Sequence, residues 1–242
     1  MTRLSLHRAA CGLVLYLAAA TAVLAGSFQV SPVRAVLSRA HPVSALTIRN
    51  TGSDPAVIQL QSVAWTQRDG KDTYEPAPDI LATPPIFTVP AGGSQVIRVG
   101  SRRPPEAGGE RTYRLLLQEV PPPSKPGFKG LRMALCISIP LFVVPEKAVS
   151  PELHWDAVAA ASGKVRIHVV NQGSAHARLS QIRLTMADSD QLLPMSASLV
   201  YVLAGNAHDW VVDVDTSAAH VLRLTAHSDE GTVQADLAIP AR

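Results

Sequence analysis

The stretch Leu131-Arg-Met-Ala-Leu-Cys-Ile-Ser-Ile-Pro-Leu-Phe142 alternates large apolar side chains with small or polar ones. The large apolar residues of one parity are Leu131, Met133, Leu135, Ile137 and Ile139. Side chains alternate between the two faces of a β-strand, so this pattern predicts a strand with one strongly apolar face. Pro140 cannot donate the N–H that a central strand needs, which predicts a sheet edge or a strand end. A long apolar edge strand is either covered by its own protein or pairs with another chain.

Turn signals such as Asn50-Thr-Gly52 and Asn171-Gln-Gly173 divide the rest of the chain into short strand-like segments. No helical periodicity is sustained, and no repeat with a period of about 20–50 residues is present. This pattern predicts an all-β fold of two β-sandwiches. We expect strands at 28–37, 42–49, 56–65, 86–89, 94–99, 112–120 and 131–142, and then at 164–170, 178–186, 191–194, 210–214, 221–226 and 232–239.

The N-terminus has the pattern of a secretory signal peptide. Arg3, His7 and Arg8 precede an apolar run at 13–24, and Val23-Leu-Ala25 fits a small-residue cleavage site. A transmembrane anchor is the competing interpretation, but the run is shorter than the roughly 20 residues that span a bilayer. We therefore predict export of the mature chain.

The segment 145–151 begins and ends with proline, which is typical of an interdomain linker. With the N-terminal pattern, it predicts three parts. These are a signal peptide at 1–25, an N-terminal domain at 26–146 that contains the alternating strand, and a C-terminal domain at 151–242.

Charge and cysteine content exclude some classes of protein. The formal net charge is only +3, and cleavage of the signal would remove Arg3 and Arg8. No basic run with interleaved aromatic residues suggests a nucleic-acid partner. Cleavage would also remove Cys11, leaving Cys136 without an internal disulfide partner, and we expect Cys136 to be a small buried apolar residue.

Two rival functions remain open from the residues alone. An exported hydrolase would need a catalytic or metal-binding set, but no His-Glu-x-x-His or Gly-x-Ser-x-Gly motif occurs, so we expect neither enzyme activity nor a cofactor or metal. An exported adhesive or carbohydrate-binding β-sandwich would present aromatic residues. Trp65, Trp155 and Trp210 lie in apolar, strand-like surroundings, and we expect them in the core.

Four segments, taken together and in this order, resemble the periplasmic pilus-assembly chaperones of the chaperone–usher family. They are Arg34-Ala-Val36, Ala82-Thr-Pro-Pro85, Leu117-Gln-Glu-Val-Pro-Pro122 and the strand ending in Ile139-Pro-Leu-Phe142. The last segment is similar to the archaic, spore-coat-like branch. The resemblance covers the first domain, roughly 28–145.

The resemblance implies two immunoglobulin-like domains at an angle with a cleft between them, and an ATP-independent chaperone in the periplasm. Its partners would be incomplete pilus subunits and an outer-membrane usher, and the free protein would be able to self-associate through its edge strand. The chaperone would lend a strand to the subunit, a recognition mode in which backbone hydrogen bonds give affinity. The resemblance makes Arg34 the anchor for the subunit's C-terminal carboxylate. It makes Leu131, Met133, Leu135 and Ile137 the donor residues.

The sequence departs from the family at the cleft. Pro140 stands where the best-known branch has a second carboxylate-binding lysine, and Arg132 and Lys147 are candidate replacements. Glu110 and Asp229 stand where the family places the acids of an interdomain ion-pair network, but Val144 occupies the position of the basic partner. We therefore do not expect the network, and we expect both acids to be solvated turn residues.

Overall fold

Strands supply the regular secondary structure of the described part of the chain. The computed structural model describes residues 28–105, 108–123, 127, 130, 133–160, 163–188, 191–195, 199–214 and 221–239, and this part contains no helix. It therefore contains no helix long and apolar enough to cross a membrane. The predicted signal peptide and Leu131 lie outside the described residues.

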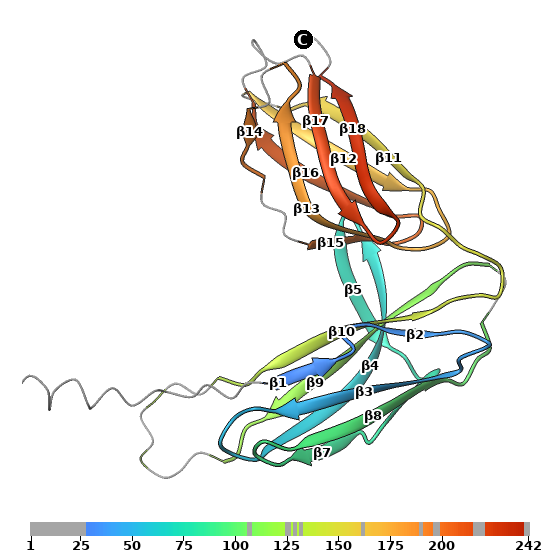
Figure 1. Cartoon of the computed structure of the whole chain (residues 1–242), viewed down its shortest axis with the longest axis vertical. Coiled ribbons are helices and arrows are strands. Elements are labelled where there is room, and N and C mark those ends of the chain that lie inside the picture. The colour runs from blue at the N-terminus through green and yellow to red at the C-terminus, as the bar shows by residue number, and fades with distance from the viewer. Residues whose placement is uncertain are drawn as a thin grey trace, which may run out of the picture.

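The first sandwich is built from β1 to β10 (Figure 1). These strands are β1 (Phe28–Ser31), β2 (Ala35–Leu37), β3 (Val43–Asn50), β4 (Ala56–Arg68), β5 (Lys71–Pro76), β6 (Ile80–Thr83), β7 (Ile86–Val89), β8 (Ser94–Ser101), β9 (Arg111–Val120) and β10 (Cys136–Val143). One sheet has the order β1-β3-β8-β6, and the other has the order β2-β10-β9-β4-β5 with β7 beside β4. Alternate residues such as Ile48, Ile97, Leu115 and Leu141 are buried between the sheets, as expected for strands with one covered face.

The second sandwich is built from β11 to β18. These strands are β11 (Leu153–Ala159), β12 (Lys164–Asn171), β13 (Ala177–Met186), β14 (Leu192–Leu193), β15 (Leu199–Val202), β16 (Ala207–Asp213), β17 (Val221–Ser228) and β18 (Gly231–Ala238). Its sheets have the orders β11-β12-β16 and β14-β13-β17-β18, with β15 paired to β13. Ile167, Leu179 and Leu224 are among its fully buried core residues.

The single strand predicted at 28–37 is wrong, because two strands in different sheets replace it. β1 pairs with β3 in one sheet, whereas β2 pairs in parallel with β10 in the other. The chain changes sheet between them at 32–34, where Pro32 fixes its own φ and cannot donate to a ladder. Arg34 therefore lies at a bend, one residue before β2.

The two sandwiches lie at an angle, and the β4–β5 hairpin extends from the first to the region of β15 in the second (Figure 1). The side-chain amide of Gln67 makes two hydrogen bonds across this contact, donating to the carbonyl of Tyr201 (2.8 Å) and accepting from the N–H of Leu203 (2.9 Å). Trp65, Phe142 and Leu203 form a small buried cluster beside it. This contact gives the two sandwiches a partly apolar, hydrogen-bonded junction.

Candidate functional site: the open edge of β10 and the interdomain cleft

β10 is paired along its whole length on one side and only in part on the other. Its register with β9 runs from Cys136 opposite Gln118 to Val143 opposite Arg111. On the other side, β2 pairs only with residues 141–143. In the described part of the chain, no strand pairs with residues 136–140 on that side, and we call this backbone the open edge. The prediction that Pro140 lies at a sheet edge is confirmed.

Backbone hydrogen bonds show which groups face the open edge. Glu119 N–H donates to the carbonyl of Leu135 on the β9 side, whereas Val144 N–H donates to the carbonyl of Leu37 on the β2 side. Backbone direction alternates along a strand, so even-numbered residues of β10 direct their N–H and C=O groups away from β9. The open edge thus presents both groups of Cys136 and Ser138 and the carbonyl of Pro140.

The apolar face of this strand runs from the core into solvent. Ile139 is 3% exposed and belongs to the core, and Ile137 packs partly against the same core. Further toward the N-terminus the exposure rises to 40% at Leu135 and 71% at Met133. These two residues precede β10, which begins at Cys136 and not at 131 as predicted. An apolar row that leaves its own core beside an unpaired backbone edge is able to complete the core of another sandwich.

Cys136 is exposed, which corrects the prediction that it is a buried apolar residue. Its side chain lies on the face of β10 opposite the apolar row, at the end of the strand that the second sandwich does not cover. The parity of the strand contained this information, because Cys136 and Ser138 share the small and polar face.

Arg34 lies where the two sandwiches meet. Its guanidinium pairs with the carboxylate of Asp229, from the turn between β17 and β18, and Arg178 of β13 approaches the other oxygen of the same carboxylate at 3.5 Å. The side chains of all three residues are 36–41% exposed. Asp229 therefore joins a cation of the first sandwich to a cation of the second.

The interdomain network that the sequence argued against is present with other partners. The Glu110 side chain is only 4% exposed, and its Oε1 lies 2.7 Å from Nδ1 of His176 and accepts the backbone N–H of His176 at 3.2 Å. The His176 ring stacks on Phe142 of β10, with 3.7 Å between centroids. The expectation of a solvated turn acid is therefore wrong for Glu110. Asp229 lies exposed in the turn between β17 and β18, as expected, but it pairs with Arg34 and Arg178, so the expectation that the network is absent is wrong.

A second arginine, which the sequence reasoning missed, lies beside Pro140. Arg114 of β9 is directly opposite Pro140, and Ala35 is opposite Leu141, so Arg34 lies on the other side of Pro140. The neighbouring row, Ala35, Leu141 and Tyr113, is buried in the core. By alternation, Arg34, Pro140 and Arg114 share the outward face. Of the earlier candidates, Lys147 is exposed in the segment after β10 and Arg132 lies outside the described residues.

The guanidinium of Arg114 is held by aromatic rings. Its central carbon lies 3.7 Å from the centroid of Trp65 and 5.3 Å from that of Tyr201. Among the described residues, no carboxylate forms an ion pair with it, and its Nε is buried without a hydrogen-bond partner. It lines a pocket of about 470 Å³ between the sandwiches, together with Gln67, Tyr201 and other residues. An oriented, unpaired guanidinium of this kind suits a carboxylate ligand.

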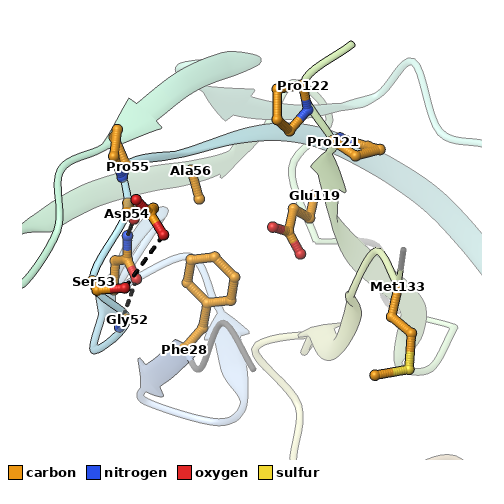
Figure 2. A pocket seen from close by; sticks show the side chains of 11 residues that line it. Phe28, Gly52, Ser53, Asp54, Pro55, Ala56, Glu119, Pro121, Pro122 and Met133 are labelled. Carbon is orange, nitrogen blue, oxygen red and sulfur yellow. Dashed lines mark hydrogen bonds between the residues drawn. The ribbon is translucent and has the colours of Figure 1, made fainter. Parts of the chain in front are cut away.

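A further pocket, of about 500 Å³, lies where the segment before β10 approaches β1 and β9. Phe28, Glu119 and Met133 contribute to its lining, together with the loop after Asn50 and the prolines after β9 (Figure 2). Glu119 bonds to the segment before β10, because its Oε2 accepts the N–H of Leu135 at 3.1 Å.

The remaining candidates from the sequence have structural surroundings. Trp65 and Trp210 are buried, as predicted, and Trp155 stacks on Trp210 and packs against the core of the second sandwich. His154 and His168 each pair with one carboxylate, of Glu152 and Asp209 respectively. No group of three or more histidine, cysteine, aspartate or glutamate side chains in the described ranges is arranged to hold a metal ion.

Fold and site define a two-sandwich, all-β protein whose first sandwich ends in a strand with an open edge. The family described as pili and flagellar-assembly chaperone, PapD N-terminal domain, matches residues 27–149. This match covers half of the chain, and the protein belongs to that family of pilus-assembly chaperones. The family is a class of chaperones and not of enzymes. No curated protein sequence matches the chain.

Several solved structures share the fold. In the CsuC–CsuE chaperone–tip adhesion subunit complex from archaic chaperone–usher Csu pili of Acinetobacter baumannii, the match is 22% identical with a TM-score of 0.67, covering 89% of this chain and 100% of that chain. The match to the SafA pilin–SafB chaperone complex of Salmonella enterica is 17% identical with a TM-score of 0.62, and it covers 88% of this chain and 98% of that chain. The match to the YadV chaperone is 17% identical with a TM-score of 0.62, and it covers 86% of this chain and 98% of that chain. These likenesses confirm the predicted fold class, two immunoglobulin-like sandwiches at an angle with a cleft between them.

Proposed function

We propose that this protein is a periplasmic, ATP-independent chaperone that holds pilus subunits by donor-strand complementation and delivers them to an outer-membrane usher. The observation that carries this proposal is the open edge of β10 beside an apolar row that leaves the core. A folded, monomeric sandwich gains nothing from exposing both, because an unpaired apolar edge promotes aggregation. Membership of the pilus-chaperone family and the likeness to chaperones solved with their subunits support the same conclusion.

In this mechanism the subunit adds a strand to residues 136–140. Its backbone would bond to the groups that Cys136 and Ser138 present, while Leu131, Met133, Leu135 and Ile137 fill successive pockets of its incomplete core. Full burial of one such side chain contributes about 1.5–3 kcal/mol before ordering costs are subtracted. Met133 and Leu135 have the most to gain, because they are 71% and 40% exposed in the free protein.

The C-terminal carboxylate of the subunit would bind over Pro140, between Arg34 and Arg114. Their strands are separated by β10 alone, so the two backbones lie about 10 Å apart, within reach of two long side chains converging on one ligand. A charge-assisted hydrogen bond of this kind contributes roughly 1.5–3 kcal/mol. Arg34 would exchange Asp229 for the incoming carboxylate, while Arg114 has no carboxylate partner to lose among the residues that the structure describes.

The remaining parts of the proposal follow from the sequence. Residues 1–25 direct export, residues 26–146 form the donor domain, and residues 151–242 form the second domain. In the absence of a subunit, the same open edge would pair with a second copy of the chain.

Co-purification from the periplasm tests this function. Tagged chain is expressed with a panel of pilus subunits that lack their own final strand, as wild type, Leu135→Glu and Arg34→Ala. Two matched controls are Val96→Glu, at a residue of β8 that is also 40% exposed, and Arg49→Ala, at an exposed arginine of β3. We expect a one-to-one complex with wild type and both controls, and loss with Leu135→Glu and Arg34→Ala.

The other outcomes separate the parts of the mechanism. Loss with Leu135→Glu alone would keep strand donation and remove Arg34 as the anchor. Equal recovery from all variants would refute the mechanism.

A further inference from the structure

The ladder between β9 and β10 ends in an irregular rung. Cys136 is opposite Gln118, so the next rung would join Leu135 to Glu119. In a regular antiparallel rung these residues would exchange two backbone hydrogen bonds. Only one of the two is present, from Glu119 N–H to the carbonyl of Leu135 at 2.8 Å.

A side chain replaces the missing backbone bond. The N–H of Leu135 donates to the carboxylate Oε2 of Glu119 at 3.1 Å. The carbonyl of Glu119, which would have accepted this N–H, instead accepts the side-chain amide of Gln118 at 3.3 Å. Glu119 thus binds Leu135 by its own N–H and by its own carboxylate.

The sequence explains why the ladder ends here. Pro121 and Pro122 follow β9, and neither can donate an N–H to continue the pairing. Among the described residues, the position of Leu135 therefore depends on the bonds at Glu119 and on the Gln118 side-chain amide, which donates to the carbonyl of Leu135 at 3.5 Å. On the other side of β9, Glu119 and Val120 remain paired with Ile58 and Val57 of β4, so the support for the carboxylate is part of the sheet.

We infer that Glu119 is a positioning residue for the donor strand. Its carboxylate fixes the last rung of the β9–β10 ladder, and so sets the point at which the segment carrying Met133 and Leu135 leaves the sheet. The inference rests on the proposed function for its consequence, which is that the exposed donor side chains are presented in one register before a subunit arrives. Pre-ordering of a bound conformation lowers the entropic cost of binding.

Amide hydrogen exchange in the free, full mature chain tests the positioning without any subunit. The variants are Glu119→Ala, which removes the acceptor, and Glu119→Gln, which keeps an acceptor oxygen without the charge. Glu75→Ala, at an exposed residue of β5 in the same sheet, is the matched control. We expect exchange at the Leu135 amide to rise about tenfold or more in Glu119→Ala, as for loss of a hydrogen bond to a charged acceptor.

A specific pattern distinguishes positioning from general weakening. The Tyr113 and Ile139 amides, deeper in the sheet, should keep their exchange rates in Glu119→Ala, and Glu119→Gln should restore most of the protection at Leu135. Unchanged exchange at Leu135 in Glu119→Ala would overturn the inference. So would a uniform rise across β10, which would indicate a loss of stability only.

Subunit binding supplies the second readout. With a subunit that wild type retains, Glu119→Ala should weaken the complex roughly three- to tenfold, and Glu119→Gln should weaken it less. Altered exchange with unchanged binding would refute the role in presentation. If wild type retains no subunit from the panel, the proposed function fails, whereas the exchange result still decides whether Glu119 positions Leu135.

Discussion

Mutations at Ile139 and Leu135 can separate two roles of the apolar row. One is to fill the core of the first sandwich, and the other, in the proposed mechanism, is to bind a subunit. Both belong to the same apolar row, but Ile139 is 3% exposed within the core of the first sandwich and Leu135 is 40% exposed beyond it. We predict that Ile139→Ala lowers the stability of the free chain. The molecules that remain folded should bind subunits with the affinity of the wild type. Leu135→Ala should leave stability nearly unchanged and weaken the subunit complex.

The magnitudes follow from burial. Truncation of a buried isoleucine to alanine costs about 2–5 kcal/mol of folding free energy, because it removes transfer energy and leaves a cavity. A half-exposed residue outside the core contributes roughly 0.5 kcal/mol or less. If a subunit buries the Leu135 side chain, its truncation removes about 1.5–3 kcal/mol of binding free energy, or roughly 10- to 150-fold in affinity.

Two measurements check this prediction. Urea unfolding of the free chain, followed by tryptophan fluorescence, gives the stability of each variant. Exchange of a purified chaperone–subunit complex against differently tagged wild-type chaperone gives the dissociation rate. The reasoning is refuted if Leu135→Ala unfolds as easily as Ile139→Ala, since Leu135 would then belong to the chaperone's own core. It is refuted equally if the complex with Leu135→Ala dissociates at the wild-type rate.

Three further predictions concern the junction and the core. Gln67→Ala should remove both hydrogen bonds to β15 and its neighbouring loop. The free energy of unfolding should fall by about 1–3 kcal/mol, because the N–H of Leu203 loses its acceptor. In calorimetry, a single unfolding transition should split into separate transitions for the two sandwiches. Burial and the hydrogen bond to Asp79 raise the pKa of Tyr113 to about 12. The folded chain therefore keeps the Tyr113 proton above pH 10, while the unfolded chain loses it. The free energy of unfolding should fall by about 2 kcal/mol between pH 10 and 12. Unfolding curves measured in this range should show that Tyr113→Phe abolishes the decline. Burial lowers the pKa of His208 below its ordinary 6.5. The contribution of His208 to the free energy of unfolding should therefore be fully present above pH 6.5 and be lost at lower pH, as the unfolded chain takes up the proton. His208→Asn should make the unfolding midpoint less dependent on pH between pH 7 and 5.

Local patterns predicted the parts of the fold that depend on local physics. β7 was predicted with its observed bounds, and β3, β9 and β12 within a residue or so, because alternation and turn residues mark their ends. β5 was missed because nearly all its residues are exposed, so no alternation marks it as a strand. It leaves the sandwich to reach the second domain, and only the folded protein shows that contact.

The site divides in the same way. Arg34 and the apolar row were identifiable from motifs and parity, whereas Arg114 depends on the register of β9 against β10, which no single segment contains. The partnership of Glu110 with His176 joins residues on different domains. Val144 in place of a basic residue predicts loss of the network, but His176 just before β13, Arg178 within β13 and Arg34 before β2 supply other partners.

Pro140 marks the boundary between the two tasks of β10. C-terminal to it, Val144 N–H bonds to Leu37, and the alternation of the strand brings the N–H of Phe142 to the same side. The next donor toward the N-terminus in that series would be residue 140, which as proline has none. The parallel pairing with β2 therefore ends where β10 lacks a backbone donor and where the partner chain bends at 32–34. At residues 136–140 the edge is open, and a strand that pairs there meets no backbone N–H at Pro140. In the proposed mechanism the C-terminus of the subunit meets this condition, because its carboxylate would bind Arg34 and Arg114 instead of a backbone N–H.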